Sequence, residues 1–80
     1  MSSFGQVPLK DVWAMLEQCA PDHSIQERTH HYCISYGEKS YPAFPKGEHG
    51  KQNPSIQKGH VRKMARFFGI LECAKAALSI

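Results

Sequence analysis

Residues 30–36 constrain the fold most, because they combine aromatic and β-branched side chains and end at a glycine. This composition predicts a strand of roughly 5–7 residues that begins at His30 and turns at Gly37. Successive side chains of a strand face opposite sides, so His30 shares a face with the other even-numbered residues, and His31 shares the opposite face with Cys33. One of the two adjacent histidines is therefore expected to be more exposed than the other. Because histidine can accept or donate a proton near neutral pH, the pair is a candidate site for chemistry.

Two shorter runs are expected to flank this strand. Residues 24–28 predict a hairpin partner that joins it through a tight turn around residues 28–29. Residues 40–44 predict a third strand, which Pro42 and Pro45 place at an edge of the sheet or end early. Three consecutive strands with short connections predict an antiparallel meander.

Apolar residues at helical spacing predict three helices. The first begins near Pro8, which fits the first turn of a helix, and stops at Pro21. The second begins around Gly59 and ends at Gly69, which suits a left-handed C-terminal cap. Residues 71–80 predict a short third helix. Together the helices and strands predict one small α+β domain over residues 1–80.

The remaining segments carry fewer signals. Residues 1–6 are expected to be frayed, and residues 46–54 are expected to form a polar loop. No stretch resembles a signal peptide or a membrane span, which favours a cytoplasmic location. The three cysteines lack the paired spacing of a disulfide framework, so they are expected to be buried free thiols. They are Cys19, Cys33 and Cys73.

The charge is unevenly distributed along the chain. Residues 1–38 hold two basic and five acidic residues, whereas residues 39–66 hold seven basic residues and one acidic residue. A basic half on a small domain favours a polyanionic partner, of which nucleic acid is the commonest. The alternative is an ordinary solvated surface.

Several motifs occur in an order that points to one family. They are Thr29-His30 at the start of the second strand, the proline and glycine loop 44–50, the segment 56–64 and the helix end 68–70. With the order of helices and strands, these motifs resemble the HicA family of bacterial toxins over roughly residues 9–70. HicA toxins are small RNA-cutting proteins that are paired with HicB antitoxins.

The resemblance implies a fold like that of double-stranded-RNA-binding domains, with two helices on one face of a three-stranded antiparallel sheet. It also implies a metal-independent endoribonuclease that cleaves messenger RNA, needs no cofactor and uses His30 as the catalytic residue. A HicB-like antitoxin would cover the His30 face. Arg28 stands where the family usually has glycine. This difference keeps open a non-catalytic RNA-binding module of the same fold, and a protein-interaction domain is a further alternative.

Basic residues and further histidines complete the candidate site. Metal-free RNA cleavage needs a base for the 2′-hydroxyl proton, an acid for the leaving oxygen and cations for the developing charge. Segment 62–66 resembles the basic cluster on the second helix of double-stranded-RNA-binding domains. The candidate RNA-binding residues are Arg28, Lys58, Arg62, Lys63 and Arg66, and the accessory candidates are Thr29, His31, His49 and His60.

The residue types also suggest two other kinds of site. Cys33 and His31 could be drawn as a nucleophile and its base, but no oxyanion donor or third partner accompanies them. A zinc site would draw on Cys19, His23, His30, His31, Cys33 and His49, yet these residues lack the close paired spacing of structural zinc ligands. The sequence therefore predicts no metal site. The three tyrosines are expected to pack mainly against the core, although RNA-binding sheets also use such rings for stacking.

Overall fold

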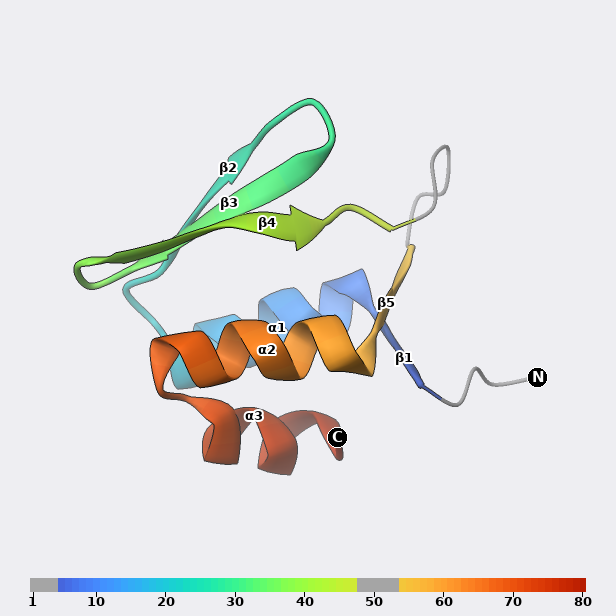
Figure 1. Ribbon diagram of the computed structural model, residues 1–80. Helices are drawn as coiled ribbons and strands as arrows, with labels where there is room; N and C mark the ends of the chain where they lie inside the picture. Colours follow the sequence, from blue (N-terminus) through green and yellow to red (C-terminus); the bar gives the residue numbers. More distant parts are fainter. Residues whose placement is uncertain (1–4, 48–53) are drawn as a thin grey trace.

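The computed structural model describes residues 5–47 and 54–80, and within these residues it contains three layers (Figure 1). A three-stranded sheet forms the first layer, helices α1 and α2 lie beneath one of its faces, and helix α3 lies beneath these two helices. In chain order the elements are β1 (Gln6–Pro8), α1 (Leu9–Cys19), β2 (Ser24–Glu27), β3 (His31–Tyr36), β4 (Lys39–Pro45), β5 (Ser55–Gln57), α2 (Lys58–Phe68) and α3 (Leu71–Leu78). The predicted small α+β fold is confirmed.

The main sheet is the predicted antiparallel meander, with strand order β2-β3-β4. Strand β3 begins at His31, one residue later than predicted. The backbone N–H of Arg28 donates to the carbonyl oxygen of His31 at 2.8 Å and closes the turn between β2 and β3. His30 therefore lies in this turn, immediately before the strand.

The two faces of β3 are divided as the alternation predicts. Ile34 is buried, and the ring of Tyr32 meets the edge of Trp13 from α1 at a centroid distance of 5.1 Å. Tyr36 packs edge-on against Phe68 of α2 at 6.0 Å. The even-numbered strand residues thus face the helices, and the odd-numbered residues, beginning with His31, face away from them.

Strand β4 is an edge strand, as its prolines predict. Phe44 pairs with Tyr32 and Tyr41 pairs with Ile34, so two residues of β4, Pro42 and Ala43, lie opposite a single residue of β3. Such a bulge leaves one residue outside the regular hydrogen-bond ladder, which suits a proline because it has no N–H to donate.

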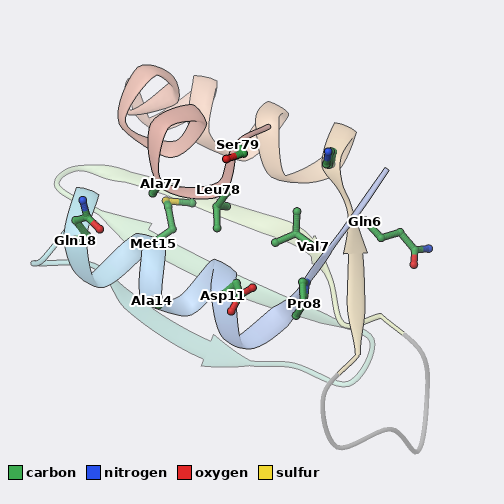
Figure 2. A pocket seen from close by; sticks show the side chains of 11 residues that line it. Gln6, Val7, Pro8, Asp11, Ala14, Met15, Gln18, Ala77, Leu78 and Ser79 are labelled. Carbon is green, nitrogen blue, oxygen red and sulfur yellow. The ribbon is translucent and has the colours of Figure 1, made fainter. Parts of the chain in front are cut away.

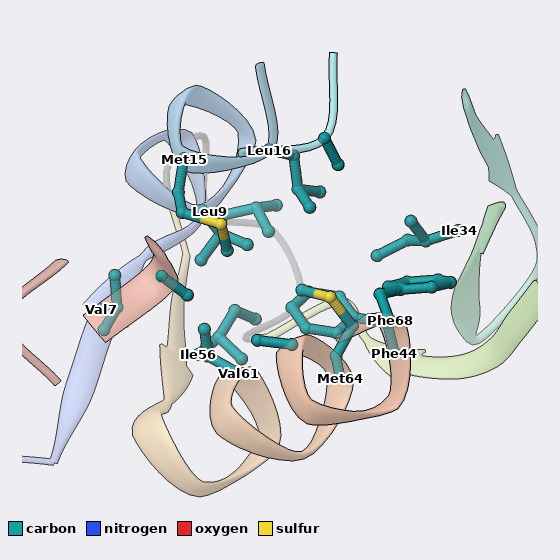
Figure 3. Close-up of a cluster of buried hydrophobic side chains, with 14 residues drawn as sticks. Val7, Leu9, Met15, Leu16, Ile34, Phe44, Ile56, Val61, Met64 and Phe68 are labelled. Atoms are coloured by element: carbon teal, nitrogen blue, oxygen red, sulfur yellow. The ribbon is translucent and has the colours of Figure 1, made fainter. Parts of the chain in front are cut away.

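Helices α1 and α2 supply most of the core below the sheet. Their buried residues recur at intervals of three and four, which places them on one face of each helix. Figure 3 shows these side chains meeting Ile34 and Phe44 of the sheet and Ile56 of β5. Gly69 ends α2 with a φ of 77°, and the N–H of Ile70 donates to the carbonyl of Ala65 at 2.9 Å, which confirms the predicted left-handed cap.

A second, two-stranded sheet was not predicted. Strands β1 and β5 pair antiparallel, with Val7 opposite Ile56, so Pro8 closes a strand instead of lying in the first turn of α1. The N–H of Lys58 donates to the carbonyl of Gly5 at 2.6 Å and extends this connection into α2. Runs of three residues are too short to show a strand period in the sequence. Their pairing holds the start of α1 beside the start of α2.

The cysteine prediction is wrong for two of the three residues. Cys19 at the end of α1 forms a disulfide with Cys73 of α3, with a Cα–Cα distance of 5.9 Å. The two lie 54 positions apart, and the packing of α3 against α1 brings them together. Cys33 is a free, half-buried thiol. In the described ranges no helix is long and apolar enough to cross a bilayer.

Candidate functional site

Two histidines from distant parts of the chain line one open hollow of about 290 Å³. His30 belongs to the turn before β3, and His60 belongs to the first turn of α2. We call this feature the His30–His60 hollow. Its other lining residues include Lys46 and Gly47 after β4, and Ser55 and Gln57 of β5. Both histidines are exposed, so both rings are accessible to a ligand that enters the hollow.

Close backbone packing holds the two sides of this hollow together. Gly47 has a φ of +84°, and a Cβ atom at this position would lie only 2.7 Å from the Cβ of Pro54. The end of β4 therefore rests directly on the start of β5. Strand β5 continues without a linker into α2, with Gln57 at the N-cap position, so His60 is held beside this contact.

The hollow can accommodate acid–base chemistry on an anion. Two imidazoles at one site can serve as a proton acceptor and a proton donor in the same reaction. The first turn of α2 contains no acidic residue, and the positive end of a helix dipole favours an anion such as phosphate. These features are compatible with cleavage of a phosphodiester.

A second, wider hollow of about 790 Å³ adjoins the first at the β2–β3 turn. Its lining includes Arg28, Thr29, His30 and His31, so the structure brings these four candidate residues together. His30 lines both hollows, whereas His31 lines the second hollow and His60 lines the first. The position of His30 between the two hollows distinguishes it from its neighbour.

Arg28 fits the turn without strain, although the family that the sequence resembles usually has glycine here. Among the described residues, Ser79 is the only residue other than glycine with a positive φ. Arg28 therefore adopts an ordinary backbone conformation, and its Nη2 atom donates to Oε1 of Gln26 at 2.9 Å. The turn geometry in this chain does not require a glycine.

Lys46 lines both hollows but is already paired. Its Nζ atom lies 2.8 Å from Oε2 of Glu27 and 5.5 Å from the ring centroid of Tyr32. The ion pair connects the end of β4 with β2. We therefore assign Lys46 a role in holding the walls of the hollows.

The basic residues of α2 are divided between different surroundings. Arg62 is half-buried and its Nη1 atom donates to the backbone oxygen of Ile80 at 2.8 Å. Lys58 lines a groove of about 550 Å³ with residues of β1, α1 and α3 (Figure 2). Lys63 and Arg66 are exposed. The predicted RNA-binding set is therefore not one continuous patch.

Two residues of the alternative zinc site are engaged elsewhere. Cys19 belongs to the disulfide, and the Nδ1 atom of His23 donates to the carbonyl of Ala20 at 2.7 Å. Within residues 5–47 and 54–80, no three His, Cys, Asp or Glu residues lie close enough to hold a metal ion. His49 lies outside the described residues.

The sequence predicted both histidines of the His30–His60 hollow but not their pairing. The two residues lie thirty positions apart and belong to different elements, so no local motif connects them. Gly47 and Gln57 were not predicted as site residues either. The short strands β1 and β5, which have no clear sequence signal, bring these residues together.

The chain matches no family model, no curated protein and no solved structure.

Proposed function

We propose that this protein is a metal-independent endoribonuclease of the HicA type, the toxin of a toxin–antitoxin pair that acts on messenger RNA. The observation that carries the proposal is the convergence of His30 and His60 on one hollow. The Thr29-His30 motif of the resemblance occupies the turn beside this hollow, and α2 adds the exposed cations Lys63 and Arg66 and no acidic residue.

The proposed reaction uses the 2′-hydroxyl of the RNA as the nucleophile. One imidazole accepts the proton of this hydroxyl while its oxygen forms a bond to the adjacent phosphorus. The bond from phosphorus to the 5′ oxygen breaks, and the other imidazole donates a proton to that oxygen. The products are a 2′,3′-cyclic phosphate and a free 5′-hydroxyl, so no metal ion or external nucleophile is required. Nearby cations stabilise the charge that develops on the phosphate.

The same proposal assigns a partner and a compartment. A HicB-like antitoxin would inhibit the enzyme by covering the turn that carries His30 and the start of β3 at His31, since both histidines are exposed. Messenger RNA as a substrate places the enzyme in the cytoplasm. Because the cytoplasm is reducing in most organisms, Cys19 and Cys73 would be thiols during function there.

Replacing either histidine of the hollow tests the proposed reaction. His30→Ala and His60→Ala should each lower the rate of RNA cleavage by about 10²–10⁴-fold, the usual contribution of a group that transfers a proton. Single-turnover cleavage of a labelled RNA measures these rates, with circular dichroism as a check on folding.

His31→Ala is the matched control, since it removes an exposed imidazole that is adjacent to His30 in the chain but does not line the His30–His60 hollow. It should retain cleavage within a few-fold. Parental activity in His60→Ala would refute the two-histidine mechanism. A parent that binds RNA without cutting it would be a non-catalytic RNA-binding module. A parent that does not bind RNA even at low salt would be a protein-interaction domain.

A further inference from the structure

Strand β4 and helix α2 lie side by side and run in opposite directions (Figure 1). At one end, Lys39 Nζ donates to the carbonyl oxygen of Phe67 at 3.1 Å. At the other end, Lys46 after β4 lines the same hollow as His60. The protein surface along both elements therefore extends from the His30–His60 hollow to Phe67. We call it the β4–α2 edge, and its residues are Lys39, Tyr41, His60, Lys63 and Phe67.

The α2 residues of this edge form one stripe. His60, Lys63 and Phe67 are separated by three and four residues, so they lie on the same side of the helix. All three are exposed. At 1.5 Å per residue, the stripe extends about 10 Å along the helix axis. A ligand in the hollow at His60 would thus meet Lys63 and then Phe67 if it continued along α2.

Phe67 is an unusual residue to leave exposed. Among the described residues, it and Ile25 are the only large hydrophobic side chains that are exposed, at 40% and 37%. The ring centroids of Tyr41 and Phe67 lie 5.5 Å apart, and Nζ of Lys39 also lies 5.5 Å from the Phe67 centroid. The ring is therefore supported by a second aromatic side chain and has a cation over one of its faces, which leaves the other face for a base.

This combination of groups fits RNA better than an apolar protein partner. The exposed residues Lys63 and Arg66 of α2 and the ammonium group of Lys39 are cations near Phe67, and α2 has no acidic residue, so the surroundings of Phe67 complement a polyanion. An exposed aromatic ring stacks on bases of any sequence when these bases are unpaired. In a duplex, the neighbouring bases already occupy both faces of each base. The ring therefore selects single-stranded RNA.

We infer that the β4–α2 edge binds single-stranded RNA, with one unpaired base stacked on Phe67 and the cleaved phosphate in the His30–His60 hollow. This inference rests on the proposed function, to which it adds the class of RNA and a residue that positions it. Phe67 does not touch the reacting atoms. It acts by holding the strand.

The test compares Phe67→Leu with Phe67→Trp. The probes are a fluorescent single-stranded 2′-O-methyl RNA, which lacks the attacking hydroxyl, and the same strand annealed to its complement. Phe67→Leu should weaken binding of the single strand by roughly 5- to 150-fold, the range of base–aromatic stacking, and should leave duplex binding unchanged. Phe67→Trp should retain parental affinity. Fluorescence anisotropy gives the affinities, and Ile25→Ala is the matched control because it removes a similarly exposed apolar side chain from β2.

A second measurement uses only the parent protein, so it does not depend on whether a variant folds. Single-stranded RNA with a photoreactive uridine is crosslinked to the parent protein. The product is reduced with a thiol, because Cys73 is bonded to Cys19, and is then digested with trypsin. Because trypsin cuts after Arg66 and Lys75, a crosslink at Phe67 should appear on the peptide of residues 67–75.

The outcomes separate this inference from the proposed function. Suppose that the parent binds the single strand. Parental affinity in Phe67→Leu, or crosslinks only outside residues 67–75, would then overturn the inference and leave the ribonuclease proposal intact. Equal binding of single strand and duplex by the parent would also overturn it. Failure of the parent to bind either probe would instead refute the proposed function. The exposed ring would then be a candidate contact for a protein.

Discussion

At the scale of single residues, Gly47 has no room for a side chain. Its positive φ disfavours any L side chain, and a Cβ atom would collide with Pro54. Gly47→Ala should therefore destabilise the protein by about 1–3 kcal/mol and slow cleavage, because β4 and β5 must separate to admit the methyl group. Urea denaturation measures the first effect, and cleavage of a labelled RNA measures the second.

Gly59 provides the control for this substitution. It lies in α2 without a positive φ, and a Cβ atom there would meet nothing within 4 Å. Gly59→Ala should raise the free energy of unfolding by up to about 1 kcal/mol, because alanine favours the helix. If Gly47→Ala were as stable as the parent, the contact between β4 and β5 would not hold the hollow together.

The sequence predicted residue positions well where a repeating pattern was available. The alternation in residues 30–36 correctly separated Ile34, Tyr32 and Tyr36, which face the helices, from the outer face that begins at His31. The start of the strand was wrong by one residue, because a backbone hydrogen bond between Arg28 and His31 determines it. No pattern of residue types encodes that bond.

At the scale of helices and strands, length decides what the sequence could predict. Helices of eight to eleven residues and the three-stranded meander have enough turns or alternations to be recognised. Strands β1 and β5 have three residues each and form because the two segments pair with each other in the folded protein. Since these strands position Gln57 and His60, the joining of the two histidines could not be predicted either.

Under the proposed function, helix α2 leads to a prediction about which cations contact the RNA. Lys63 and Arg66 are exposed, whereas Arg62 is half-buried and bound to the backbone oxygen of Ile80. The double variant Lys63→Gln/Arg66→Gln should weaken RNA binding and reduce the slope of log affinity against log salt by about 1.4, since each phosphate contact to a single strand contributes about 0.7. Arg62→Gln should leave this slope nearly unchanged and cost about 1 kcal/mol of stability through the lost hydrogen bond.

Affinities measured at several salt concentrations distinguish these two roles. The salt dependence of Lys58→Gln is measured alongside these variants for comparison, because Lys58 lines the groove between α1 and α3 and not the β4–α2 edge. A reduction of the slope by Arg62→Gln that equals the effect of Lys63→Gln alone would show that the bond to Ile80 does not withhold Arg62 from RNA.

At the scale of the whole molecule, the Cys19–Cys73 disulfide should account for a large part of the stability. It closes a loop with a sequence separation of 54 residues, for which the loss of chain entropy in the unfolded state predicts about 4 kcal/mol. Measured disulfides commonly contribute about 2–4 kcal/mol. Urea denaturation with and without a dithiol reductant should show a decrease in this range.

Cysteine variants identify the source of this decrease. The double variant Cys19→Ser/Cys73→Ser should have the lower stability under both conditions, whereas Cys33→Ser should respond to the reductant like the parent, because Cys33 is a free thiol. An unchanged free energy of unfolding in the reduced parent would show that the packing of α3 alone accounts for its attachment to α1. The loop-entropy argument would then be wrong for this fold.

The same bond changes the connectivity of the chain. In the oxidised protein, residues 19–73 form a covalent ring that includes the main sheet, α2 and both histidines of the hollow. A protease that cuts one peptide bond inside this ring leaves two fragments that remain a single molecule. The cut would be invisible by electrophoresis until a thiol is added. The molecule could thus lose the continuity of its backbone and keep all of its mass.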